Sequence, residues 1–137
     1  MKISISIIFI FLIFCCNNSD DYIPIVAVNE SIALNLPQHS EILNPGASIF
    51  VSGGVKGLII YHGFGNNYKV YDRVCTYLPQ LDCSIIDSIN SGIAYCGCCS
   101  SAFNISNNAE PLNQPAIREL ISYNWSLDNN NVLKIFN

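Results

Sequence analysis

The alternation of apolar and polar positions predicts β-strands along most of the chain. Ile32, Leu34 and Leu36 are apolar at every second position, which is typical of a half-buried strand, and a proline follows to end it. Further β-branched or aromatic runs, separated by turn-forming Gly, Asn, Asp and Pro residues, cover Ser48–Val51, Leu58–Tyr61, Tyr68–Tyr71 and Val132–Phe136. Because no strongly amphipathic helix interrupts these runs, the pattern predicts an all-β fold, an antiparallel sandwich or barrel.

The N-terminal apolar run has a different character. Ile3–Phe14 holds twelve uncharged residues directly after Lys2. It is shorter than the roughly 18 apolar residues that a membrane-spanning helix requires, and it is basic at its front. Residues 1–15 are therefore interpreted as a signal peptide.

Cys16 is the expected lipidation site at the end of this signal. A lipoprotein signal has a branched apolar residue three positions before the modified cysteine and a small residue just before it, and Ile13 and Cys15 meet these requirements. An ordinary secretory signal with incidental cysteines is the alternative. Residues 16–23 are polar and acidic and are interpreted as a tether. The expected location is a bacterial cell envelope, with the domain bound to a membrane through lipid and either periplasmic or surface-exposed.

Length and charge limit the kind of domain that the tether can carry. The chain has 137 residues, so residues 24–137 have room for one domain with a modest core. The formal net charge is −4, and it becomes −5 once the segment that carries Lys2 is removed. The remaining Lys and Arg residues are scattered along the chain, and this distribution excludes nucleic acid as an expected partner.

Five cysteines remain in the predicted domain, on two segments that are poor in strand pattern. Cys75 and Cys83 lie on the first segment, and the second contains Cys96, Cys98 and Cys99. A short strand pair between the segments, Ser84–Asp87 and Ile93–Tyr95, would bring both loops to one tip if it forms a hairpin. Disulfides are the simplest expectation for exported thiols. Zinc is a further option that the cysteine spacing disfavours, and a thioredoxin-like motif is disfavoured because a strand follows it.

The two segments resemble the ligand loops of a Rieske iron–sulfur domain. The second Rieske loop runs Cys-Pro-x-His-Gly-Ser-x-Phe, and its Cys, His, Ser and Phe places are occupied here by Cys96, Cys99, Ser101 and Phe103. The first often runs Asp-x-x-Cys-x-His-Leu, and its Asp, Cys, His and Leu places are occupied by Asp72, Cys75, Tyr77 and Leu78. The resemblance, which extends to Rieske-like lipoproteins of flavobacteria and other Bacteroidota, implies a Rieske-like fold over residues 24–137.

The same resemblance implies an unusual centre, because Tyr77 and Cys99 stand in both histidine places. A Rieske [2Fe–2S] cluster takes two thiolates on one iron and two imidazoles on the other. The implied non-standard ligand set is Cys75, Tyr77, Cys96 and Cys99, with Ser101 as a hydrogen-bonding neighbour of the cluster; Cys83 could replace the tyrosine.

Some Rieske domains also carry a bridge between the two loops, and the nearest equivalents of its cysteines are Cys83 and Cys98. In that arrangement Cys75 and Cys96 could form a second bond, with Cys99 left over. The resemblance therefore leaves two functions open. One is a cluster-free, disulfide-stabilised structural or interaction module, which is favoured because both histidines are lost. The other is a one-electron carrier with a [2Fe–2S] cluster.

No general base or nucleophile pair suggests an enzyme. The expected partners are a membrane, reached through the lipid anchor, and a redox or protein partner that the sequence does not identify. The two histidines, His39 and His62, are expected at the surface rather than as ligands.

Overall fold

The computed structural model describes residues 22–137. The predicted signal peptide, Cys16 and most of the predicted tether lie outside the described residues. In the part of the chain that is described, no helix is long and apolar enough to cross a membrane. These residues form one 3-10 helix, η1 (Pro37–Leu43), and the strands β1 (Asn29–Ala33), β2 (Ser48–Val51), β3 (Leu58–His62), β4 (Tyr68–Asp72), β5 (Ile86–Asn90), β6 (Ile93–Cys96), β7 (Ala102–Asn104), β8 (Glu110–Pro111), β9 (Ser122–Leu127) and β10 (Val132–Phe136).

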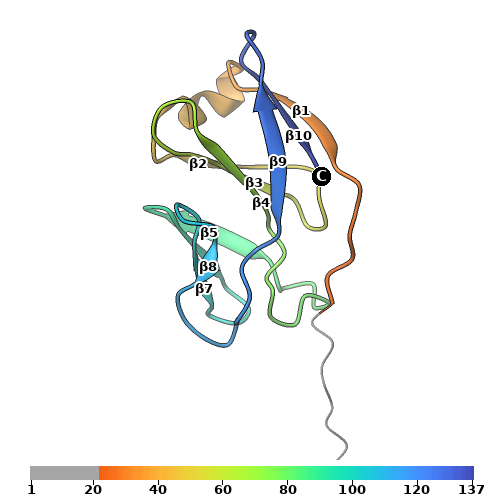
Figure 1. Ribbon diagram of the computed structural model, residues 1–137. Coiled ribbons are helices and arrows are strands. Elements are labelled where there is room, and N and C mark those ends of the chain that lie inside the picture. Colours follow the sequence, from red (N-terminus) through yellow and green to blue (C-terminus); the bar gives the residue numbers. More distant parts are fainter. Residues whose placement is uncertain (1–21) are drawn as a thin grey trace, which may run out of the picture.

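The strands build two antiparallel sheets, which confirms the all-β prediction. The larger sheet has the strand order β1-β10-β9-β4-β3-β2, and the smaller has the order β5-β6-β7-β8. In Figure 1 the smaller sheet lies beneath β2, β3 and β4, and the chain passes back from it to the larger sheet through β9.

Strand β3 connects the two halves of the core because it is buried on both faces. Leu58 and Ile60 pack into one apolar cluster with residues of β4, β9 and β10. Ile59, between them, belongs to a second cluster that contains Ile86 and Phe103 of the smaller sheet. All three β3 side chains are fully buried, and each contributes about 1.5–3 kcal/mol to folding by its removal from water. This two-sided burial explains why the strand is a continuous apolar run rather than an alternating one.

Two predicted strand boundaries are wrong. β1 ends at Ala33, and Leu36 is exposed rather than buried. The cause is Pro37, which begins η1, because the fixed φ of proline suits the first turn of a helix. The predicted strand at Ser84 begins at Ile86 instead, since Ser84 is buried in the preceding loop and its hydroxyl donates to the carbonyl of Tyr77.

Candidate functional site

Two loops carry the cysteines, and the β5–β6 hairpin brings them together. The first loop, residues 73–85, joins β4 to β5; the second loop, residues 97–101, joins β6 to β7. Pairing of Ile86 with Cys96 places the end of one loop beside the start of the other. The hairpin predicted between the loops is therefore present, and the loops meet as expected.

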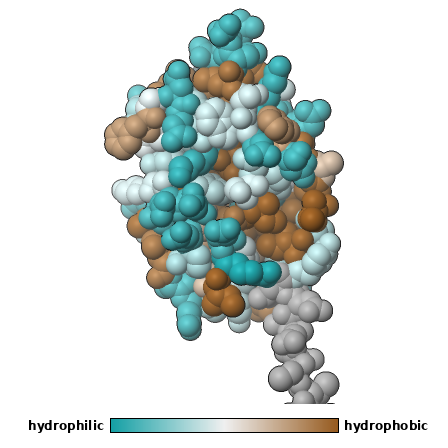
Figure 2. Space-filling view, in the orientation of Figure 1, coloured by the Kyte–Doolittle hydropathy of each residue, from teal (hydrophilic) through white to brown (hydrophobic). Residues whose placement is uncertain are grey.

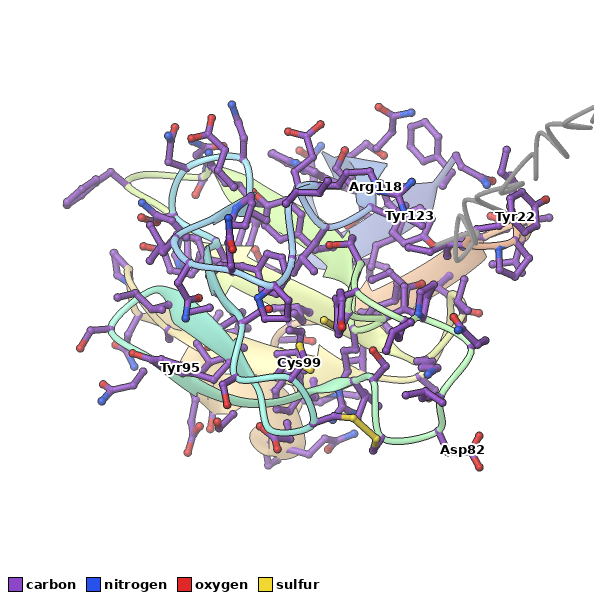
Figure 3. All side chains as sticks on the ribbon, turned by 90° about the horizontal axis from the view of Figure 1, so that it is seen from below. Tyr22, Asp82, Tyr95, Cys99, Arg118 and Tyr123 are labelled. Atoms are coloured by element: carbon purple, nitrogen blue, oxygen red, sulfur yellow. A yellow bond between two sulfur atoms is a disulfide. The ribbon has the colours of Figure 1, made fainter. Side chains whose placement is uncertain are left out.

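A disulfide between Cys83 and Cys98 joins the two loops on the outside. Both residues are exposed, and their Cα atoms are 5.3 Å apart. In Figure 3 this bond lies at the edge of the domain beside the loop that carries Asp82. The bridge that the resemblance implies is thus present. The second bond considered for Cys75 and Cys96 is not formed, and both remain free thiols.

The other three cysteines converge in the interior. The Cys99 sulfur lies 3.3 Å from the Cys75 sulfur and 3.2 Å from the Cys96 sulfur. All three sulfurs lie within 4.8 Å of one another. Cys75 and Cys96 are buried and Cys99 is half-buried, lying inward of the disulfide in Figure 3. The structure therefore brings together three of the four residues that the sequence nominated as metal ligands.

The thiols differ in how readily they ionise. Burial raises the pKa values of Cys75 and Cys96, because a thiolate there would lose its hydration. Burial also opposes ionisation of Cys99, but hydrogen bonds that Ser101 and the neighbouring thiols can donate to a Cys99 thiolate outweigh it and lower the pKa of Cys99. A negative charge in the cluster is therefore most stable on the Cys99 sulfur.

Ser101 lies directly behind the cluster and is fully buried. Its hydroxyl oxygen accepts hydrogen bonds from the Cys99 thiol at 3.2 Å and from the backbone N–H of Ala116 at 3.0 Å. Asn113 holds the same loop from outside, because its amide donates to the carbonyl of Ser100 and its oxygen accepts from the N–H of Ala102. The serine that the resemblance singled out is in contact with the Cys99 sulfur.

The first loop is fixed by residues that sequence reasoning missed. The Lys56 ammonium donates to the carbonyls of Leu81 and Ser84, on either side of Cys83. The Thr76 hydroxyl donates to the carbonyl of Arg118 at 2.7 Å. No local motif identifies these residues, since each contact joins segments at least 25 positions apart.

Both the backbone and the side chain of Tyr77 make contacts that fix its position in the first loop. Its carbonyl accepts the hydroxyl of Ser84, its N–H faces the Cys75 sulfur, and its half-buried side chain packs against the core of the smaller sheet. A phenolate is a hard oxygen donor, whereas thiolates are the soft donors that iron–sulfur clusters and soft metal ions prefer. The three thiols are therefore the stronger part of the predicted ligand set.

The residues around the sulfurs do not complete a Rieske ligand set. The chain has two histidines. The ring of His62 lies between the carbonyls of Ile42 and Gly65, at the end of β3 opposite Leu58. Since Leu58 pairs with Asp72, which precedes the first loop, His62 lies at the far end of the strand from the cysteines. His39 contacts the carbonyl of Ala33. The expectation that His62 is a surface residue is wrong, because it is buried.

The sulfurs do not complete an all-cysteine set either. A four-thiolate [2Fe–2S] cluster needs four free cysteines. Bonding of Cys83 to Cys98 leaves three among the described residues. The donor atoms near the loops therefore complete neither the Rieske ligand set nor the four-cysteine set.

Comparisons with known proteins show which solved structures have a similar fold. No protein-family model matches the chain, and no curated protein matches it. The chain is similar to a chain in the complex of reduced oxygenase and oxidized ferredoxin in carbazole 1,9a-dioxygenase, with 17% identity, a TM-score of 0.51 and coverage of 80% of this chain and 92% of that one.

Two other solved structures give lower scores. The ferredoxin of carbazole 1,9a-dioxygenase from Nocardioides aromaticivorans IC177 has 13% identity and a TM-score of 0.45, with 68% of this chain and 86% of that one covered. A small subunit of a putative NADPH nitrite reductase has 13% identity and a TM-score of 0.46, with 80% and 98% covered. The likeness to the first of the three structures shows that the domain has the fold of Rieske-type ferredoxins.

Proposed function

We propose that the chain is a bacterial envelope lipoprotein whose Rieske-like domain is a cluster-free, disulfide-stabilised interaction module. The observation that carries the proposal is the pairing of Cys83 with Cys98, which uses two of the five cysteines to cross-link the loops. A Rieske centre would need two imidazoles at the tip, and both histidines have backbone partners elsewhere. The fold in this proposal is kept as a scaffold rather than as a cluster holder.

Bridging of two loops by a disulfide suits an exported protein. The bond closes a segment with a sequence separation of 15 residues, so it restricts the unfolded chain and stabilises the loop arrangement. A chain anchored at Cys16 would be outside the cytoplasm, where such a bond persists. Lipidation and the disulfide are consistent with each other in this respect.

The position of the loops supports an interaction close to the membrane. The described chain begins at Tyr22 and Ile23, which line one surface hollow together with Thr76 of the first loop. Figure 2 shows an apolar area beside the grey segment at this end of the domain. Since Ile23 lies seven residues after Cys16, the tether reaches at most about 25 Å even when fully extended. The cysteine loops would therefore face partners at the membrane surface.

The principal experiment is iron and acid-labile sulfide analysis of the protein purified without reductant from cells with active cluster assembly. We expect a colourless protein, and mass spectrometry that finds Cys83 joined to Cys98 and the other three domain cysteines free. A coloured protein with two irons and two sulfides per chain would establish the alternative, a one-electron carrier, and overturn the proposal. Five freely alkylated domain thiols would also overturn it.

The anchor is tested separately with Cys16→Ser. We expect the wild-type chain in the membrane fraction and the variant in the soluble fraction, with Cys15→Ser as the matched control that stays with the membrane. Equal membrane association of all three chains would contradict lipidation at Cys16.

A further inference from the structure

The three thiols that the disulfide leaves free are arranged as a site of their own. We infer that Cys75, Cys96 and Cys99 bind one soft metal ion of the Cu⁺ and Zn²⁺ class through three thiolates. This inference rests on the proposed function, because a cluster-bearing carrier would use the same sulfurs for iron. It adds a ligand that the cluster-free module would hold.

The sequence spacing disfavoured zinc, but with Cys98 in the disulfide the remaining Cys96 and Cys99 have the two-residue gap that zinc ligands commonly show. The separations of the sulfurs also suit a single ion. With metal–sulfur bonds of about 2.3 Å, three sulfurs around one ion are separated by roughly 3.8–4.0 Å. The observed separations of 3.2 and 3.3 Å need to open by about 0.5–0.8 Å. A disulfide would require the sulfurs to approach to about 2.05 Å, a change about twice as large. Two irons are a poorer fit, since Cys99 would bind the second iron and bridging sulfides would separate it from the other two thiolates.

The surroundings favour a soft ion and protect it. Thiolates select Cu⁺, Zn²⁺ and related ions over hard cations such as Mg²⁺ and Ca²⁺. Cys75 and Cys96 are buried, and the exposed Cys83–Cys98 bond closes the loops outside them. Ser101 adds a buried hydroxyl in contact with Cys99, which is the kind of outer partner that orients a metal ligand.

The site also leaves access for an external ligand. Cys99 is half-buried, so its side of the cluster faces solvent while the other two sulfurs face the core. Three protein ligands leave a fourth tetrahedral position for water or a partner's donor atom. Binding involves no change of oxidation state: each coordinating thiol releases one proton to solvent, and the metal–sulfur bond replaces the S–H bond.

The test is a titration of the full-length purified protein, after iron and sulfide analysis, with Cd²⁺ as a spectroscopically detectable substitute for Zn²⁺. We expect one Cd²⁺ per chain, with an ultraviolet thiolate-to-metal charge-transfer band. Cys99→Ser should weaken binding by more than about 100-fold, since loss of a ligand should exceed the 10–100-fold cost of losing an outer partner. A variant with Cys83→Ser and Cys98→Ser is the matched control and should still bind one ion. Titration with Cu⁺ against a Cu⁺ chelator shows which ion of the class binds more tightly.

A second measurement uses the wild-type chain, in case a cysteine variant does not fold. Stoichiometric Cd²⁺ should protect Cys75, Cys96 and Cys99 together from alkylation, as read by mass spectrometry. Lack of both the band and the protection, with Cu⁺ binding also absent, would overturn the inference but leave the cluster-free function standing. Unchanged affinity in Cys99→Ser would overturn it as well. Recovery of iron and sulfide would instead overturn the proposed function.

Discussion

The Tyr123 hydroxyl donates a hydrogen bond of 2.9 Å to the Asp72 carboxylate in the interior of the domain. The same carboxylate accepts the backbone N–H groups of Val55 and Val74 at 2.6 and 2.8 Å. Asp72 ends β4 and stands three residues before Cys75, and Tyr123 belongs to β9. One buried carboxylate therefore ties β9, the β2–β3 turn and the start of the first cysteine loop to one another.

Removal of this hydroxyl should weaken the domain. Tyr123→Phe is expected to lower the free energy of unfolding by about 1.5–3 kcal/mol, the usual range for a hydrogen bond to a charged group. Tyr95→Phe is the matched control, because Tyr95 is 40% exposed and its loss of a hydroxyl should cost little. Urea unfolding followed by fluorescence measures both. Equal stability of the two variants would show that the Asp72 contact contributes nothing.

The stability of the domain should fall at alkaline pH in a way that depends on Tyr71. Burial raises the pKa of Tyr71 to about 12 from an ordinary value of 10.0. A phenol whose pKa is raised on folding stabilises the protein below pH 10, and this contribution is lost as the pH rises through 10 towards 12. In Tyr71→Phe no phenol ionises at position 71, so the stability lost there between pH 10 and 12 is no longer lost. The variant also lacks the 3.3 Å hydrogen bond from the Tyr71 hydroxyl to the carbonyl of Ile105.

We therefore expect Tyr71→Phe to be less stable than the wild type at neutral pH, by about 1 kcal/mol, and to approach it above pH 10. Thermal unfolding at a series of pH values checks this, and the thiols titrate equally in both chains. A stability difference that stays constant from pH 7 to 11 would be inconsistent with the raised pKa.

Lys56 should hold the first loop in a fixed conformation. Lys56→Met keeps the length of the side chain but removes its hydrogen bonds to Leu81 and Ser84. We expect a loss of about 1 kcal/mol, reduced by solvent exposure of the ammonium, and faster amide exchange at Ser84. Lys134→Met, at an exposed position of β10, provides the comparison. Unaltered exchange in the loop would mean that the disulfide alone fixes it.

The disulfide should contribute at least as much stability as the strongest of these contacts. Replacement of Cys83 and Cys98 by serine is expected to lower the free energy of unfolding by about 3 kcal/mol, as loop-closure entropy predicts for a loop of this length. The paired sheets should still form, because the core clusters contain neither residue. Circular dichroism and urea unfolding under non-reducing conditions measure fold and stability. Wild-type stability in the double variant would show that the bond does not restrict the unfolded chain.

Local sequence patterns predicted most of the strands, apart from two boundaries and the two-residue strand β8, and they predicted the meeting of the two loops. The β3 run and the hairpin between the cysteine segments depend on nearest neighbours in the chain, which is the information that periodicity carries. The pairing of Cys83 with Cys98 came from a family resemblance, since spacing alone permits several connectivities.

Contacts between distant segments could not be predicted. Lys56 and Asn113 hold the loops from other parts of the chain, and no pattern around them indicates this. The burial of His62 also depends on tertiary structure, because its ring stacks on Tyr68 with centroids 4.5 Å apart and contacts a carbonyl twenty residues away. The residues next to a histidine at a hairpin end do not indicate that its side chain is buried.

Replacement of Ser101 distinguishes a metal-binding site from three thiols that are only packed together. In Ser101→Ala the Cys99 sulfur loses its hydroxyl neighbour and the N–H of Ala116 loses its acceptor. If the three thiolates bind an ion, Cd²⁺ affinity should fall about 10–100-fold, the usual cost of losing an outer hydrogen bond at a metal ligand. Metal-free stability should also fall, by about 1–3 kcal/mol for the unsatisfied N–H. Ser100→Ala, at an exposed position of the same loop, should change neither quantity. A stability loss in Ser101→Ala with wild-type Cd²⁺ affinity would assign the serine to loop packing alone.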